Sequence, residues 1–341
     1  MRHYSLWLDK YSRRRTQILD SWSGFAKTVG ELRAKIPSDS IFRKLHDAGE
    51  VETRMCFVDG GEGFRELLGL GVYFIRASGL ILSKSPGAGH GELFIRDLDM
   101  NVIDYDDHTK DRVELLRDGM EYDVAIRCVE EVKPHILFLD GSLYVKARRK
   151  PIECAEYELY RKKYARLLRL AKKEGVRLVG VSEDSKSRLL AAYLASEHKV
   201  KFPKFMTDSA ILRILSGGGA FRTIEFTPPS RFETEENIGE GIVASFPTAY
   251  MQPTGLSNPL RVDVPDWEKD LSGILSTIAS LCKGSGQYGY PLPLYIAHMD
   301  ACIAPAQMDW TVKQVVNYVS KRDSTLASAV LKSTRRNSRP Q

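Results

Sequence analysis

The chain has 341 residues, of which 43% are hydrophobic and 28% are charged. These shares are typical of folded globular proteins and exclude a disordered or fibrous chain. Its most apolar stretch, residues 67–82, is interrupted by Arg76, before it reaches the roughly 18 residues that a membrane-spanning helix needs. The N-terminus also lacks the pattern of a secretion signal. We therefore expect a cytoplasmic protein without a membrane segment, built as one elaborated domain or two closely packed ones.

The net charge of +6 is distributed unevenly. Residues 146–173 carry +8 and residues 321–341 carry +5, so the rest of the chain carries −7. Basic segments in an otherwise acidic chain are typical of proteins that bind nucleic-acid phosphates. They are equally typical of a solvated helix face and a frayed tail. Charge alone leaves both interpretations open.

The first half of the chain predicts a regular order of elements. Residues 1–40 show the apolar spacing of a helix. A meander of three antiparallel strands is expected next, over residues 55–61, 70–82 and 92–105. The pattern then alternates between helix and strand, over residues 109–133, 136–143, 153–174 and 176–181. This order is that of a ribonuclease H-like fold, an α/β class with a mixed sheet flanked by helices.

The second half is less regular. Its expected helices and strands are a helix over 208–215, short strands between Pro228 and Pro265, a helix over 266–282, a strand over 293–297 and a helix over 309–321. The whole chain divides into a helical arm, a central α/β domain and a basic tail, over residues 1–45, 46–320 and 321–341.

Two aspartates, Asp59 and Asp140, each end an apolar run and precede a glycine. Carboxylates at strand ends on a rigid sheet are well placed to share a divalent cation, whose ligands are oxygens. Asp-Gly also marks ordinary turns, and either aspartate alone is explained in that way. Because each member of the pair ends a predicted core strand, a metal site and two ordinary turns explain the pair equally well.

Two further segments offer ligands. Glu121 borders the apolar stripe of the helix expected from Thr109, with Glu114 as its main rival. Late in the chain, His298 and Asp300 lie at the end of the strand expected over 293–297, where residues two apart share a side. His298 is then a ligand or a proton shuttle, and Asp300 a ligand or its orienting partner. A structural histidine is the alternative.

These groups suit phosphodiester hydrolysis with two cations, in which carboxylates from several elements hold the metals and no covalent nucleophile is needed. The sequence contains no GxSxG, no GxxxxGK[ST] and no HExxH, so serine hydrolase, P-loop ATPase and zinc protease sites are not indicated.

Five motifs together resemble one known family. They are FVDGG from Phe57, EYDVAI from Glu121, FLDGSL from Phe138, TDSAIL from Thr207 and GYPLPLYIAHMDA from Gly289. This set resembles the NurA nucleases of archaea and some bacteria, and the resemblance covers about residues 50–305.

The resemblance implies a ribonuclease H-like nuclease that uses Mn²⁺ or Mg²⁺, with two ions expected. It implies 5′-to-3′ exonuclease and single-strand endonuclease activity on DNA, a homodimer, and work with a hexameric HerA ATPase in end resection for recombinational repair. The residues carried over as the metal site and its support are Asp59, Glu121, Asp140, His298 and Tyr290. Asp300 is a further candidate ligand, and Asp208 is structural or supporting.

DNA contacts are expected from Arg148, Arg149 and Lys150, at the entrance to the helix over 153–174. A solvated face or a contact with the ATPase explains this basic block equally well. The family often carries a basic residue just after the strand ending near Val181, where this chain reads SEDSKSR. Lys186 is the candidate replacement.

Two alternatives stay open. The same carboxylates could be structural in a catalytically silent DNA-binding clamp, with the basic segments gripping the DNA. The nuclease could also act on RNA, because the motifs do not specify the sugar.

Overall fold

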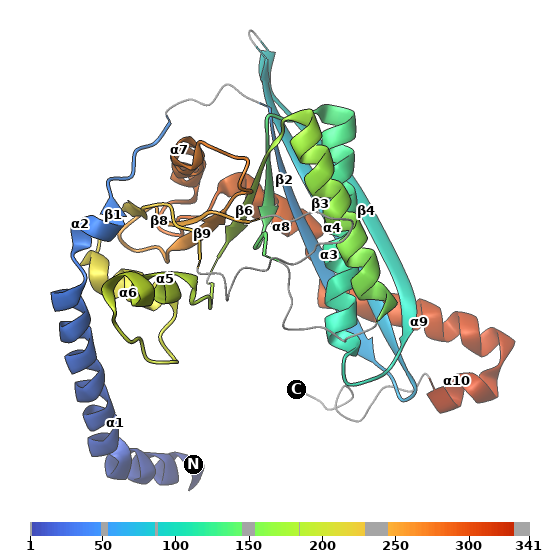
Figure 1. Ribbon diagram of the computed structural model, residues 1–341. Helices are drawn as coiled ribbons and strands as arrows, with labels where there is room; N and C mark the ends of the chain where they lie inside the picture. Colours follow the sequence, from blue (N-terminus) through green and yellow to red (C-terminus); the bar gives the residue numbers. More distant parts are fainter. Residues whose placement is uncertain are drawn as a thin grey trace.

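The computed structural model describes residues 2–48, 54–85, 88–144, 154–183, 185–228 and 245–330. A nine-stranded mixed sheet runs through them in the order β1-β7-β8-β9-β6-β5-β2-β3-β4 (Figure 1). The strands are β1 (Phe42–Arg43), β2 (Met55–Glu66), β3 (Leu70–Ser85), β4 (Ala88–Asp104), β5 (Ile136–Asp140), β6 (Arg177–Ser182), β7 (Phe221–Thr223), β8 (Thr248–Gln252) and β9 (Leu260–Asp263).

The sheet confirms the predicted fold class. Strands β2, β3 and β4 form an antiparallel meander. Strand β5 then pairs with β2 in parallel, and β6 pairs with β5 in parallel. The order β4-β3-β2-β5-β6 is therefore the ribonuclease H-like order that the first half of the sequence predicts. Strands β9, β8, β7 and β1 extend the sheet beyond β6 in antiparallel steps.

Helices cover both faces of the sheet (Figure 1). They are α1 (Arg2–Lys35), α2 (Ser38–Ile41), α3 (Thr109–Arg127), α4 (Ala155–Glu174), α5 (Leu189–His198), α6 (Asp208–Ser216), α7 (Leu271–Cys282), α8 (Leu292–Ala301), α9 (Pro305–Arg322) and α10 (Ser324–Val330). None of these described helices is both long enough and apolar enough to span a bilayer.

Strand β2 lies between two hydrophobic cores because successive side chains point to opposite faces of a sheet. Cys56 and Val58 pack in the core formed with α3 and α4. Met55 and Phe57 pack in the core formed with α7 and α8. Asp59 continues the alternation of Phe57, so its side chain faces α8.

The N-terminal segment is partly integrated into the sheet. Leu32 and Ile36, near the end of α1, are buried against residues of α5 and α6. Strand β1 pairs with β7, so the last part of the expected arm belongs to the sheet. Closer to the N-terminus, α1 projects away from the sheet and exposes Trp7 and Tyr11 (Figure 1).

The C-terminal segment packs over the distal part of β2 and β3. Met308 of α9 and Ala327 of α10 are buried in a small core with Leu67 and Val72. The first residues of the expected basic tail therefore continue α9 and form α10. The remaining tail, residues 331–341, lies outside the described residues.

Candidate metal centre

Asp59 is positioned by the long strand β2. It follows a fully buried apolar run and is itself buried, with 5% of its surface exposed. Its Oδ1 accepts a hydrogen bond from the backbone N–H of Gly60 at 2.7 Å. Its Oδ2 lies 2.8 Å from His298 Nδ1. These two contacts fix the carboxylate at the surface of the sheet that α8 covers.

Asp140 ends β5, the parallel neighbour of β2. The pairing of Val58 with Leu139 places Asp59 and Asp140 side by side, each one residue further along its strand. Gly141 follows with φ of +127°, a conformation that L side chains rarely adopt, and the chain leaves the sheet there. The carboxyl ends of neighbouring parallel strands are the usual position of ligand sites in α/β sheets.

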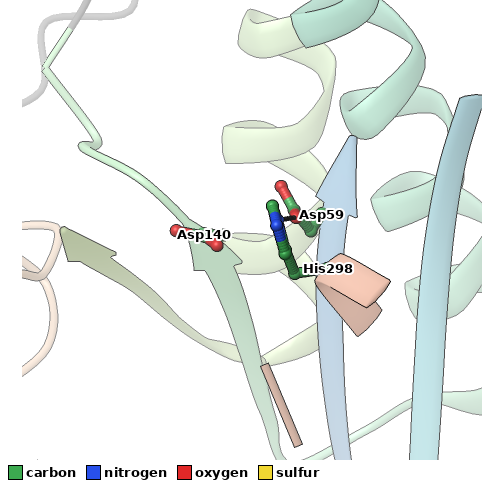
Figure 2. Close-up of side chains that lie close together, drawn as sticks. All are labelled: Asp59, Asp140 and His298. Carbon is green, nitrogen blue, oxygen red and sulfur yellow. Dashed lines mark hydrogen bonds and ion pairs between the residues drawn. The ribbon is translucent and has the colours of Figure 1, made fainter. Parts of the chain in front are cut away.

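His298 reaches the two aspartates from α8, and the strand expected over 293–297 is wrong. The segment is a helix from Leu292 to Ala301, with Pro293 in its first turn. Proline is tolerated there because the first backbone N–H groups of a helix have no partner within it. A short apolar run does not distinguish a strand from a helix by its periodicity. The imidazole nevertheless points at Asp59 (Figure 2).

One ligand atom from each of Asp59, Asp140 and His298 lies within 4.8 Å of the other two. Figure 2 shows the three side chains converging from β2, β5 and α8. Because Nδ1 of His298 faces Asp59 at 2.8 Å, an ion shared by these two residues would bind that nitrogen in place of the hydrogen bond. Two carboxylates and one imidazole suit Mn²⁺, and the oxygens suit Mg²⁺.

The electrostatics of the cluster favour an added cation. Burial, together with the negative charge of Asp59, raises the pKa of Asp140 to about 7. The hydrogen bond to Asp59 raises the pKa of His298 above its usual value. Both shifts mean that the cluster holds protons when no ion is bound. These protons offset the repulsion between the two neighbouring carboxylates, as a cation would.

These shifts predict how metal binding depends on pH. A carboxyl whose pKa rises on folding stabilises the protein at low pH and loses that contribution as pH rises, here between about pH 4 and pH 7 for Asp140. The raised pKa of His298 acts in the same direction. Mn²⁺ replaces these protons, so its stabilising effect should be larger at about pH 7.5 than at about pH 5.5.

Thermal unfolding at both pH values, with and without saturating Mn²⁺, measures this dependence. In Asp140→Asn, the Mn²⁺-induced shift in Tm should differ less between the two pH values, because the asparagine has no proton to release. An equal Mn²⁺-induced shift in Tm at both pH values would contradict the prediction.

Tyr290 lies beside Asp140. Its side chain is buried, and its hydroxyl has no hydrogen-bond partner among the described residues. The hydroxyl is close enough to Asp140 to oppose, in part, the effect of burial on the pKa of that carboxyl. Burial and the nearby carboxylate of Asp140 raise the pKa of Tyr290 well above its usual value. The Tyr290 hydroxyl therefore lies at the edge of the cluster, beside Asp140.

Glu121 lies on the other side of β2. It is a buried residue of α3, and a Cβ built on Gly60 would lie 2.6 Å from its Oε1. Its Oε1 is 3.5 Å from Nε of Arg117. Glu121 therefore borders the residue next to Asp59, but it is outside the cluster of three ligand atoms. Its part in metal binding remains a prediction.

Asp300 is not brought into the cluster. Its carboxylate accepts hydrogen bonds from Arg96 Nε at 2.6 Å and from Ser78 Oγ at 2.6 Å. On a helix, residues two apart point in nearly opposite directions, so the reason for grouping Asp300 with His298 disappears once the segment is helical. The structure corrects the expected ligand role: Asp300 fastens α8 to β3 and β4.

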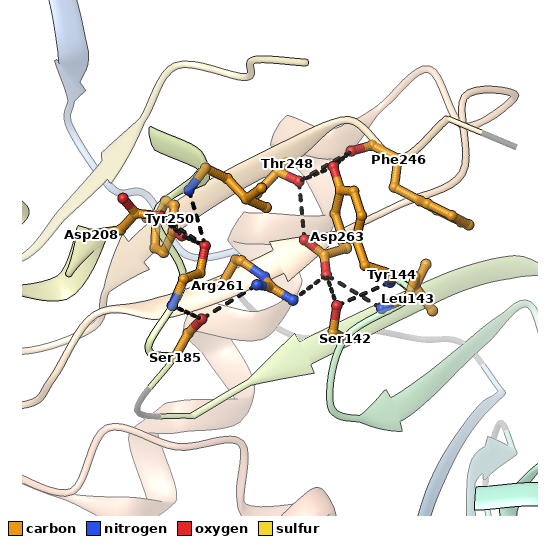
Figure 3. Close-up of polar contacts among 12 residues, drawn as sticks. Ser142, Leu143, Tyr144, Ser185, Asp208, Phe246, Thr248, Tyr250, Arg261 and Asp263 are labelled. Carbon is orange, nitrogen blue, oxygen red and sulfur yellow. Dashed lines mark hydrogen bonds and ion pairs between the residues drawn. The ribbon is translucent and has the colours of Figure 1, made fainter. Parts of the chain in front are cut away.

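A buried polar network holds the loop that follows Asp140 (Figure 3). Asp263 of β9 is fully buried and accepts hydrogen bonds from Ser142 Oγ at 3.1 Å and from Leu143 N at 3.3 Å. Arg261 donates to the same oxygen at 3.0 Å, and Thr248 donates to the other oxygen at 3.0 Å. The network ties the chain after Asp140 to β8 and β9.

Asp208 has a structural role, one of the two roles expected for it from the sequence. Its carboxylate accepts hydrogen bonds from Tyr250 Oη at 2.7 Å and from the backbone N–H groups of Leu190 and Ala191 at 3.1 and 2.9 Å. These contacts join the first turns of α5 and α6 to β8.

The expected DNA-binding residues are only partly described. Arg148, Arg149 and Lys150 lie outside the described residues, and Lys186 is exposed in the segment between β6 and α5. Two other members of the basic block form ion pairs: Lys163 Nζ lies 2.6 Å from Asp123 of α3, and Arg166 lies 2.7 Å from Glu130, in the turn that follows α3. Part of this charge therefore stabilises the packing of α4 on α3.

Sequence reasoning missed one residue beside the site. Glu183 follows β6 directly, accepts a hydrogen bond from Tyr288 Oη at 2.7 Å, and interacts electrostatically with Asp140 and His298. The pattern that singles out Asp59 and Asp140, an acid directly after a buried, largely apolar run, also applies to Glu183 after the run ending at Ser182.

The topology and the cluster define a ribonuclease H-like α/β protein with a candidate metal centre at the carboxyl end of β5 and the adjacent middle part of β2. Residues 53–303 match the family model described as the NurA domain. The chain therefore belongs to the NurA family, as its five motifs predict. No curated protein gives a significant match.

Solved NurA structures share the fold. The NurA nuclease from Sulfolobus solfataricus is 16% identical with a TM-score of 0.66, and the match covers 92% of this chain and 97% of that chain. A second NurA structure is 13% identical with a TM-score of 0.60, covering 91% and 99%. A third, NurA bound to dAMP and manganese, is 15% identical with a TM-score of 0.54, covering 91% and 97%. Family and cluster together support a nuclease.

Proposed function

We propose that the protein is a divalent-metal-dependent nuclease that hydrolyses phosphodiester bonds in DNA. The observation that carries the proposal is the convergence of Asp59, Asp140 and His298 from three separate elements. The NurA structure with dAMP and manganese supports a deoxynucleotide substrate and Mn²⁺. Mg²⁺ is the alternative ion.

The chain's own residues have defined parts in this reaction. Asp59 and Asp140 would hold the ion through carboxylate oxygens, and His298 through Nδ1, the ring nitrogen that faces Asp59. When bound, the ion acts as a Lewis acid on the phosphate and lowers the pKa of the attacking water. Before an ion binds, Asp59 orients the imidazole through Nδ1, and the Tyr290 hydroxyl would steady the Asp140 carboxylate. Glu121, across β2 at Gly60, is the candidate for a second ion.

Family resemblance supports the finer parts of the proposal. They are 5′-to-3′ exonuclease and single-strand endonuclease activity, end resection in recombinational repair, a hexameric HerA partner and a homodimer. The exposed aromatic side chains of α1 supply a surface on which another chain can pack.

Digestion of labelled oligonucleotides tests the activity. Single-stranded DNA, duplex DNA and RNA of one sequence are incubated with Mn²⁺, Mg²⁺ or EDTA. We expect cleavage of DNA with Mn²⁺ and none with EDTA. Binding without cleavage under every condition would overturn the proposal in favour of a silent clamp, and cleavage confined to RNA would overturn the DNA assignment.

A further inference from the structure

Exposed aromatic side chains lie next to the metal centre. Tyr288 is 48% exposed and Tyr295 is 40% exposed. Their ring centroids are 6.1 Å apart, with planes inclined at 77°. The edge of one ring therefore meets the face of the other at the surface. We refer to this pair as the tyrosine corner.

The tyrosine corner is held in place from both sides of the site. Tyr288 donates a hydrogen bond to Glu183, which follows β6 beside Asp140. Its ring also packs against that of Tyr290, at 5.9 Å between centroids. Gly289, with φ of +66°, makes the turn that lets these two neighbouring tyrosines approach.

Tyr295 links the corner to the histidine. It precedes His298 by three residues on α8, so both side chains lie on one face of the helix. Leu292 and Met299, at adjoining positions of this face, are 37% and 55% exposed. The surface beside His298 is therefore apolar and aromatic, although the centre itself is charged.

From this arrangement we infer that the tyrosine corner binds one unpaired nucleobase next to the phosphate being cleaved. The inference rests on the proposed function and adds a preference for single strands. Aromatic side chains bind bases of any sequence through their flat faces. A base inside a duplex has both of its faces covered by neighbouring bases, so only an unpaired or extruded base can stack on the corner.

The test measures binding without cleavage. A single-stranded oligonucleotide containing 2-aminopurine is titrated in EDTA with the full-length protein, and both the fluorescence quenching and the Kd are recorded. The double variant Tyr288→Ala/Tyr295→Ala should bind single strands roughly tenfold more weakly or worse, and it should lose the quenching. Duplex binding should change by less than about twofold, because paired bases do not reach the rings.

Three controls isolate the rings. Tyr288→Phe/Tyr295→Phe loses the hydrogen bond to Glu183 but retains both aromatic faces, so it should keep the quenching and lose much less affinity than the double alanine variant. Tyr318→Ala removes a tyrosine of similar exposure on α9, 60% exposed, and should leave binding unchanged. Circular dichroism checks that each variant is folded.

Unchanged quenching in the double alanine variant would overturn the inference, as would an equal loss in the phenylalanine variant. Cleavage of bis(p-nitrophenyl) phosphate with Mn²⁺, a substrate without a base, separates this result from the proposed function. Failure of the wild type to cleave DNA and this compound counts against the nuclease. The fluorescence quenching in EDTA does not depend on the outcome of these cleavage assays.

Discussion

Asp140→Asn is expected to lower the rate of Mn²⁺-dependent DNA cleavage by about 100-fold or more, equivalent to ~3 kcal/mol of transition-state stabilisation. The substitution keeps the size of the side chain but removes the charge that holds the ion. It also removes the charge whose burial, together with the repulsion from Asp59, raises the pKa of Asp140 to about 7. The metal-free variant should therefore be at least as stable as the wild type at neutral pH, although it has lost its activity.

Single-turnover cleavage and thermal unfolding measure the two effects. Asp123→Asn is the matched control, since it alters a half-buried aspartate of α3 that pairs with Lys163 away from the cluster. It should retain activity within about twofold. An Asp140→Asn protein that cleaves DNA at the wild-type rate would remove this carboxylate from the site.

Asp263→Ala is expected to lower the free energy of unfolding by about 3–5 kcal/mol. Arg261 is 6% exposed, and its guanidinium would be left in the interior without its carboxylate partner. The hydroxyls of Ser142 and Thr248 would lose an acceptor as well. Urea denaturation at neutral pH measures the loss.

The double variant Asp263→Ala/Arg261→Met tests whether the unpaired guanidinium of Arg261 causes this loss of stability. Replacing the unpaired guanidinium with an apolar side chain should recover part of the stability, because much of the cost comes from the buried charge that remains. Additive losses, or a loss below about 1 kcal/mol for Asp263→Ala alone, would show that the network contributes little.

The sheet could be predicted from the sequence where a single local pattern determines it. The apolar run that ends at Asp140 has the length and flanking glycine of a buried strand, and β5 ends there. The run before Asp59 is also a buried strand, but β2 continues through the glycines to Glu66, so the turn expected after Asp59 is wrong. The proximity of the two aspartates follows from the parallel pairing of β2 with β5. That pairing is implied by the helix, α3, which the sequence places between β4 and β5.

The residues that sequence reasoning misplaced depend on tertiary contacts. The apolar residues between Leu292 and Ala301 fit either a strand or a helix, and the packing of this segment against β2 and β5 favours the helix. In a helix, Asp300 and His298 point in different directions. The hydrogen bond between Ser142 and Asp263 joins residues 121 positions apart, which no local pattern indicates.

Anomalous diffraction from crystals soaked in Mn²⁺ tests the central claim most directly. The account predicts a manganese peak coordinated by the carboxylates of Asp59 and Asp140 and by the imidazole of His298. A peak held by other residues, with these three side chains keeping their metal-free contacts, would contradict it.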